Sequence, residues 1–257
     1  LDQWLEGIAG TIRSNTMTRY QGTAVRHIKP YLGDKLIAQI KGKDIQKLYE
    51  ALAQHGNRNT GKGLSSGTIR GIHSMLHEAL GAAQQAGVIP RNPTEEIEAP
   101  KFSYKPKKVL TDEQLEKFME IIQKDSVWYD FFYTELTTGL RRGEICGLMW
   151  SDFDEAHGIL SIRRTVHAQK GGRLTTGETK TGTGKRTITL PPSTAKLLAE
   201  RKTRSYSEWI FPDPLRPERP TRPNTAYTHM KVLLKQAGLP SIRFHDLRHT
   251  FATHALA

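Results

Sequence analysis

The feature that most constrains the fold is a proline-rich and basic stretch before the middle of the chain. Residues 93–108 contain three prolines, and proline is poorly tolerated inside helices and central strands. Lysines follow the last acidic residue of this stretch, Glu98. We therefore expect a basic linker over residues 101–110, although a merely disordered connector has the same composition. The linker would separate a domain of residues 1–100 from a domain of residues 111–257.

The length agrees with two domains, and the charge points to an acidic partner. The chain has 257 residues, with 38 Lys and Arg against 26 Asp and Glu, a net charge of +12. This excess favours a polyanion, because neutralised phosphates release counterions; a basic surface that only aids solubility is the alternative. Cys146 is the only cysteine, which excludes an intrachain disulfide framework and a cysteine-based zinc site. Neither a signal peptide nor a membrane span is evident, so we expect a cytoplasmic protein.

The first domain has the apolar spacing of helices. One helix is expected over residues 17–30, a second after Lys43, and a third after Ser65, whose hydroxyl can cap it. Apolar residues of the third recur at intervals of three and four, which gives it one apolar face. We predict a compact helical bundle from which Lys41, Lys43 and Arg70 could reach DNA. Isolated basic side chains are, however, more often plain surface.

The second domain opens with a helix-start signature and continues to a candidate anion site. Residues 111–114 have the sequence of a capping box. An apolar helix is expected over residues 127–138, ended by Gly139. Arg141 would then lie at the start of the next helix, where free backbone N–H groups already favour an anion. Glu144, three residues on, could hold the guanidinium in place, unless the two form only a surface ion pair.

Apolar residues of the next segment alternate, as is typical of strands. We expect strands over residues 159–166 and 187–190, with a glycine turn at residues 171–172. Residues 179–186 would form a hairpin between the strands. Its Lys180 could reach into a site as a movable ammonium, although a solvated basic turn has the same sequence.

Helical spacing returns after the strands, over residues 195–201, 225–236 and 244–251. In the last of these helices, His245, Arg248 and His249 would share a face, while Leu247 and Phe251 form an apolar stripe on another side. A guanidinium offers a rigid fork of donors to phosphate oxygens, and an imidazole adds a donor that titrates near neutrality. This helix is therefore predicted to bind a phosphate.

Residues far apart in the sequence could together serve one phosphate. Arginines 141 and 248 with His245 could stabilise the extra charge on a five-coordinate phosphorus. Lys180 could protonate a leaving alkoxide. Nothing in this set requires a metal or another cofactor, and we expect none.

Three motifs carry a resemblance to a known family. They are Thr138–Glu144, Thr179–Thr181 ahead of Arg186–Leu190, and His245–Thr250. In this order and spacing they resemble the tyrosine recombinases, the family of phage and conjugative-transposon integrases. The resemblance implies an α-helical N-terminal core-binding bundle and an α+β catalytic domain, mostly helical with a small antiparallel sheet. The two would close around a duplex as a C-shaped clamp, with the basic linker crossing it.

The resemblance also implies a reaction and a role for each motif residue. Enzymes of this kind cleave and rejoin DNA through a 3′-phosphotyrosine intermediate, and so integrate and excise a mobile element. Arg141 and Arg248 would bind the scissile phosphate, Lys180 would be the general acid toward the 5′ oxygen, and His245 would assist by proton transfer or hydrogen bonding. The candidate DNA-binding residues are Arg70, Lys41, Lys43, Lys105, Lys107, Lys108, Lys185, Arg186 and His249.

The chain departs from the family pattern in its nucleophile. The family's tyrosine follows the His-x-x-Arg segment, whereas here no tyrosine follows Tyr227. Because the sequence also begins with Leu1, we expect a truncated or processed piece that binds DNA without cleaving it. Expected partners are double-stranded core or crossover sites and, for the full-length protein, further copies of itself, as a dimer on DNA and a tetrameric synapse. The expected location is the bacterial cytoplasm, at the nucleoid.

Alternative functions remain open at this point. His245 and His249 have the spacing of a zincin helix, although Asp replaces the usual Glu, an Arg lies between them and no third ligand is evident. A purely architectural DNA-binding protein would share the basic composition. A type IB topoisomerase would share the chemistry and relax DNA instead of exchanging strands.

Overall fold

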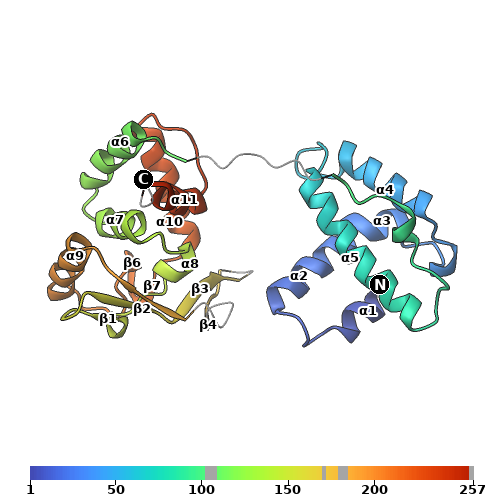
Figure 1. The fold of residues 1–257 in the computed structure, drawn as a ribbon, viewed down its shortest axis with the longest axis horizontal. Coiled ribbons are helices and arrows are strands. Elements are labelled where there is room, and N and C mark those ends of the chain that lie inside the picture. The colour runs from blue at the N-terminus through green and yellow to red at the C-terminus, as the bar shows by residue number, and fades with distance from the viewer. Residues whose placement is uncertain (102–108, 170–171, 179–184, 255–257) are drawn as a thin grey trace. The chain divides into compact units, whose positions relative to one another are not determined.

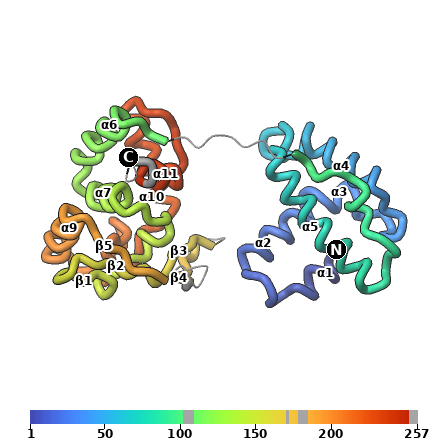
Figure 2. Tube along the Cα trace, viewed as in Figure 1, coloured from blue at the N-terminus to red at the C-terminus, as the bar shows by residue number. Residues whose placement is uncertain are grey.

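The computed structural model describes residues 1–101, 109–169, 172–178 and 185–254. Contacts divide the chain into two compact units, Leu1–Lys105 and Pro106–Ala257 (Figures 1 and 2). The linker expected over residues 101–110 lies mostly outside the described residues. Leu110, at its end, is buried in the core of the second unit.

The N-terminal unit is helical throughout its regular structure (Figure 1). Its elements are α1 (Asp2–Gly7), α2 (Ser14–Thr23), the π-helical turn η1 (Ala24–Ile28), α3 (Lys29–Leu32), the 3-10 turn η2 (Ile37–Gln39), α4 (Gly42–His55), α5 (Ser66–Gln85) and the 3-10 turn η3 (Pro93–Glu96). The helix expected over residues 17–30 is therefore interrupted by a π-helical turn. That turn buries Ala24 and Ile28 in the core of the bundle.

The predicted caps and apolar faces of the bundle are confirmed. The Ser65 hydroxyl accepts a hydrogen bond from the Thr68 N–H at 3.2 Å and so starts α5. The inner face of α5 is buried against α4. The prolines of residues 93–108 led us to expect no regular structure there. This expectation is wrong for the first four residues, because they form η3, which packs against α4 and α5. Asn92 and Thr94 are buried there and bond His77 of α5, with the Thr94 hydroxyl 2.8 Å from the imidazole.

In the view of Figure 1, the helices of the second unit lie mostly above its strands. They are α6 (Asp112–Gln123), α7 (Tyr129–Thr138), α8 (Arg142–Ile145), the 3-10 turn η4 (Trp150–Asp152), α9 (Pro192–Thr203), α10 (Pro223–Gln236) and α11 (Phe244–His254). The capping box at Thr111 and Gln114 is confirmed, with both reciprocal bonds present. The helices expected near residues 127–138, 195–201, 225–236 and 244–251 are all present.

Within the described residues, the strands form three small antiparallel sheets. They are β1 (Phe153–Asp154), β2 (Ile159–Ile162) and β5 (Arg186–Thr189) in one sheet, β3 (Arg164–Ala168) and β4 (Leu174–Glu178) in the second, and β6 (Pro212–Asp213) and β7 (Arg216–Pro220) in the third. The single strand expected over residues 159–166 is thus split at Arg163 between two sheets. Strands β4, β6 and β7 were not predicted, because their Thr, Gly, Arg and Pro residues lack alternating apolar positions.

One apolar core holds the second unit together. Aromatic side chains of α6 and α7 pack edge to face at its centre, with ring centroids of Phe118 and Phe132 6.0 Å apart. Helix α11 packs against α7, where the ring of Phe244 lies 6.2 Å from that of Phe131 between centroids, and Leu247 of α11 is fully buried. Cys146 is unpaired and also fully buried, and this burial raises the pKa of its thiol. The core therefore fixes α7, α8 and α11, and with them the turn that carries Arg141 and the helix that carries Arg248.

Candidate phosphate-binding site

Arg141 lies at the turn between α7 and α8. Gly139 ends α7 in the left-handed conformation, with φ of +57°, and Leu140 anchors the turn in the core. The Arg141 N–H donates to Glu144 at 2.9 Å, and its guanidinium donates to the same carboxylate at 2.8 Å. The prediction that Glu144 holds this guanidinium is confirmed. Arg141 is 57% exposed, so its remaining donors face outward.

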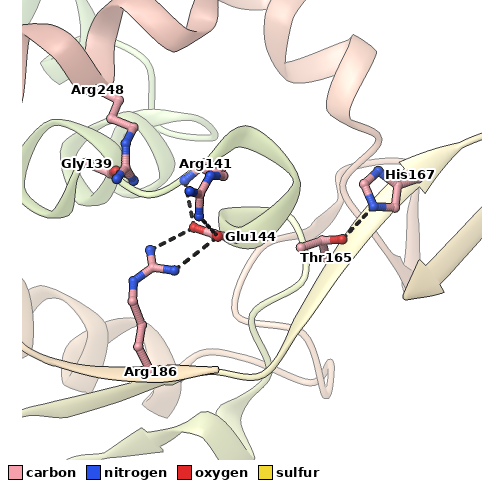
Figure 3. Close-up of polar contacts among 7 residues, drawn as sticks. All are labelled: Gly139, Arg141, Glu144, Thr165, His167, Arg186 and Arg248. Carbon is pink, nitrogen blue, oxygen red and sulfur yellow. Dashed lines mark hydrogen bonds and ion pairs between the residues drawn. The ribbon is translucent and has the colours of Figure 1, made fainter. Parts of the chain in front are cut away.

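A second arginine reaches the same carboxylate from β5. Arg186 donates to both oxygens of Glu144, at 3.1 and 2.9 Å (Figure 3). Burial opposes ionisation of Glu144, but hydrogen bonds from Arg186 and Arg141 outweigh it and lower the pKa of the carboxyl to about 2. Glu144 is therefore a carboxylate that fixes two guanidinium groups side by side. The sequence suggested Arg186 only as a general DNA contact.

Arg248 joins these arginines from α11. Its guanidinium donates to the Gly139 carbonyl, beside Arg141 (Figure 3). Burial and then the charge of Arg141 lower the pKa of Arg248, and Arg186 contributes in the same direction. Like charges thus converge on this part of the surface, offset only in part by Glu144. Such an arrangement is stable when an anion sits among the guanidinium groups.

The histidines of α11 lie on one side of the helix, as expected. The rings of His245 and His249 meet edge to face with centroids 4.6 Å apart. Burial, followed by the charges of His249 and Arg248, lowers the pKa of His245. The lowered pKa of His245 favours the neutral imidazole. Among the described residues, no group of three His, Cys, Asp or Glu side chains could hold a metal ion.

The other predicted residues fall into separate groups. Lys180, Lys105, Lys107 and Lys108 lie outside the described residues. Lys185 is exposed directly before Arg186. Lys41, Lys43 and Arg70 are exposed on the N-terminal unit, where the Arg70 guanidinium reaches the Pro100 carbonyl at 3.5 Å.

Strand β3 packs against α8. The backbone of β3 passes so close that a Cβ at Gly143 would lie 2.9 Å from the Val166 carbonyl, which explains the glycine between Arg142 and Glu144. On the same strand, the Thr165 hydroxyl lies 2.6 Å from Nε2 of His167 (Figure 3). Reasoning from the sequence did not single out this pair.

Reasoning from the sequence also missed Glu135. It is fully buried on α7, and neither carboxyl oxygen has a hydrogen-bond partner within the described part of the chain. The only available signal was an acidic residue at an otherwise apolar helical position.

Comparisons with known proteins identify the family of the chain. The model of the phage integrase family matches residues 108–257, and that of the phage integrase N-terminal SAM-like domain matches residues 1–53. The chain belongs to the phage integrase family. It resembles a tyrosine recombinase XerC-like protein from Caldanaerobacter subterraneus subsp. tengcongensis, with 29% identity over 97% of this chain and 69% of the relative.

Solved structures of integrases share the fold. The Tn1549 transposon integrase in complex with a circular intermediate DNA is 24% identical, with a TM-score of 0.80 over 98% of this chain and 85% of that chain. A lambda integrase tetramer bound to a Holliday junction is 22% identical, with a TM-score of 0.73 over 98% of this chain and 70% of that chain. The expected fold class, a helical bundle followed by a mostly helical α+β unit, is confirmed.

Family membership identifies the type of enzyme. The chain is a tyrosine recombinase, which is a DNA strand transferase. None of the helices in the described residues is long and apolar enough to span a bilayer.

Proposed function

We propose that this chain is the core of a site-specific recombinase that integrates and excises a mobile element, and that Arg141, Arg186 and Arg248 bind the scissile phosphate. The observation that carries the proposal is the convergence of three guanidinium groups: those of Arg141 and Arg186 share Glu144, and that of Arg248 lies beside Arg141 at the Gly139 carbonyl. An architectural DNA-binding protein has no need of such a pocket, and the named relatives favour a recombinase over a type IB topoisomerase.

Each group has a chemical task in this proposal. A tyrosine oxygen attacks phosphorus while the bond from phosphorus to the 5′ oxygen breaks. The guanidinium groups of Arg141 and Arg248 stabilise the charge that develops on the non-bridging oxygens. Lys180 gives its proton to the departing 5′ oxygen. His245, whose lowered pKa favours the neutral imidazole, assists by a hydrogen bond or a proton transfer.

The proposed partners are duplex core sites and further copies of the protein. The Tn1549 integrase was solved with a circular intermediate DNA, and the lambda integrase as a tetramer on a Holliday junction. By analogy, we propose that this protein acts as a dimer on DNA and as a tetramer in the synapse, at the bacterial nucleoid. Lys41, Lys43, Arg70, Lys105, Lys107, Lys108, Lys185 and His249 are proposed to contact the duplex.

Replacement of Arg141 by lysine tests the phosphate site. Arg141→Lys keeps the charge but loses the fork of donors, so affinity for orthovanadate, a tetrahedral analogue of phosphate, should fall about tenfold. Affinity for a duplex should change by less than about threefold, because many phosphate contacts share that binding. Calorimetry measures the first quantity and fluorescence anisotropy the second.

Arg163→Gln provides the matched control, since Arg163 has the same 57% exposure in the same unit and pairs with Asp152 instead of Glu144. Its vanadate affinity should equal that of the unmodified chain. Equal vanadate affinity of the Arg141→Lys variant and the unmodified chain would remove Arg141 from the phosphate site.

A further inference from the structure

Glu135 is a buried acid that the proposed reaction does not use. It lies on α7 one turn before Gly139, and its backbone carbonyl accepts the Gly139 N–H at 2.8 Å. Its side chain is 0% exposed, and both carboxyl oxygens lack a hydrogen-bond partner within the described residues. An ionised carboxylate in such a place would be strongly destabilised. The geometry therefore calls for a neutral acid.

The groups that face Glu135 belong to the phosphate site or adjoin it. Burial raises the pKa of Glu135 well above its usual range, the charge of Arg248 on α11 opposes the rise, and Glu144 on α8 adds to it. Cys146, directly after α8, also feels the Glu135 charge and is itself buried. Within the described residues, the Arg248 guanidinium has one hydrogen bond, to Gly139. Its other N–H groups are therefore available either to Glu135 or to an anion.

The charge of the site depends on Glu135. Three guanidinium groups and the Glu144 carboxylate leave two net positive charges when Glu135 is neutral. Ionisation of Glu135 would leave one. It would also offer Arg248 a buried carboxylate, and guanidinium–carboxylate pairing is among the strongest contacts that a protein makes.

We propose that Glu135 is a positioning residue that acts through Arg248. As a neutral acid it leaves the Arg248 guanidinium turned toward the phosphate, and its ionisation draws Arg248 into the core and weakens anion binding. This inference rests on the proposed phosphate site. Because linkage is reciprocal, a bound anion should also help Glu135 to keep its proton.

The test measures the affinity of the chain for sulfate from pH 5 up to the highest pH at which the chain stays folded, a range over which sulfate keeps its charge. In the unmodified chain, affinity should fall about tenfold as Glu135 loses its proton with rising pH. In Glu135→Gln, which keeps the shape and cannot ionise, affinity should stay level over the same range. Because the two proteins differ only at residue 135, the difference between the two profiles reports Glu135.

Two further variants separate the possible failures. Arg248→Gln should bind sulfate weakly at every pH; if it binds as well as the unmodified chain, the proposed phosphate site fails. If Arg248 matters but Glu135→Gln shows the same decline with pH as the unmodified chain, the Glu135 inference is overturned and the phosphate site stands. Glu135→Met, which replaces only the packing, should also give a level profile, and a decline there would equally overturn the inference.

Infrared spectroscopy gives an independent readout. The unmodified chain at neutral pH should show the carbonyl stretch of a protonated carboxyl, and Glu135→Gln should lack it. Absence of this band from the unmodified chain at pH 6 would show an ionised Glu135 and would contradict the proposal.

Discussion

At the scale of single residues, Glu144 organises the site. A buried carboxylate with two guanidinium partners offsets its desolvation cost only when the hydrogen bonds are complete, and here Arg141 and Arg186 supply four of them. Glu144 holds the guanidinium groups of Arg141 and Arg186 in fixed positions, and the N–H groups that do not bond Glu144 remain available to a phosphate. A phosphate that binds there meets groups already in position, which reduces the reorganisation needed during the reaction.

Glu144→Gln should lower the stability of the chain by about 2–3 kcal/mol at pH 7, because two arginines lose their shared charge. The folded pKa of about 2 lies below the ordinary 4.5, so this stability is present above pH 4.5 and is lost as the pH falls toward 2. The difference between the variant and the unmodified chain should shrink accordingly. Denaturant unfolding at several pH values measures it.

Glu155→Gln is the matched control for this substitution, because Glu155 is half exposed and pairs with Lys202 on the surface. It should change stability by less than about 0.5 kcal/mol. Identical unfolding midpoints for Glu144→Gln and the unmodified chain at pH 7 would contradict the role given to Glu144.

Residues of the site differ in how far the sequence could reveal them. The pairing of Arg141 with Glu144 was predictable, because a spacing of three at a helix start brings the two together. The second partner, Arg186, lies 42 residues beyond Glu144 on a strand whose register the sequence does not fix. Burial of Glu135 depends on the packing of α11 over α7, which follows from tertiary structure alone. The role of Lys180 stays a prediction.

At the scale of elements, the contact between α7 and α11 sets the position of Arg248. Gly139 has a left-handed φ of +57°, and a Cβ there would overlap the ring of Phe251 on α11. The glycine is thus required both by the backbone and by the neighbouring helix. The close approach brings the Gly139 carbonyl within reach of the Arg248 guanidinium.

Gly139→Ala should therefore destabilise the chain by more than about 2 kcal/mol and weaken sulfate binding. Gly158→Ala is its control, since Gly158 also has positive φ, +61°, but a Cβ there would meet only ordinary contact with Ala195 at 3.7 Å. The control substitution should lower the free energy of unfolding by about 1 kcal/mol, which is the effect of the left-handed backbone conformation alone. It should leave sulfate affinity unchanged. Equal losses in thermal unfolding would show that overlap with Phe251 has no energetic effect.

Helices were more predictable than strands for a physical reason. Caps at Ser65 and Thr111 and regular apolar spacing are local signals. The strands are short, and β2 and β3 separate at Arg163, whose neighbour Arg164 bonds the Gly147 carbonyl at 3.1 Å. That interaction comes from a distant part of the chain. The η3 turn could not be predicted from local sequence either, because its Thr94 is held by a hydrogen bond with His77 of α5.

At the scale of the whole molecule, the net charge of +12 attracts the phosphates of any duplex partner. The break into two units follows from the proline-rich stretch, and the family follows from three short motifs, so both were accessible from sequence. Specificity for a DNA site depends on side chains that read base edges, which composition does not reveal.

Duplex affinity should fall steeply with salt, and substitution of Lys41, Lys43 and Arg70 by glutamine should reduce that dependence. Removal of one phosphate-binding cation lowers the slope of log affinity against log salt by about 0.9. A double Lys196→Gln, Lys202→Gln variant is the control, because each of these lysines already pairs with a glutamate. Anisotropy titrations at several salt concentrations measure the slopes, and an unchanged slope for the triple variant would exclude those residues from the interface.

The burial of Cys146 has a practical consequence for labelling. Its thiol is enclosed in the core and held in the unreactive protonated form, so maleimide dyes should bypass it while the chain is folded. Cysteines introduced at the exposed positions Leu36 and Leu215 would then be the reactive sites, one in each unit. Resonance energy transfer between dyes attached there would follow the separation of the units as DNA is added, with no need to remove the native thiol.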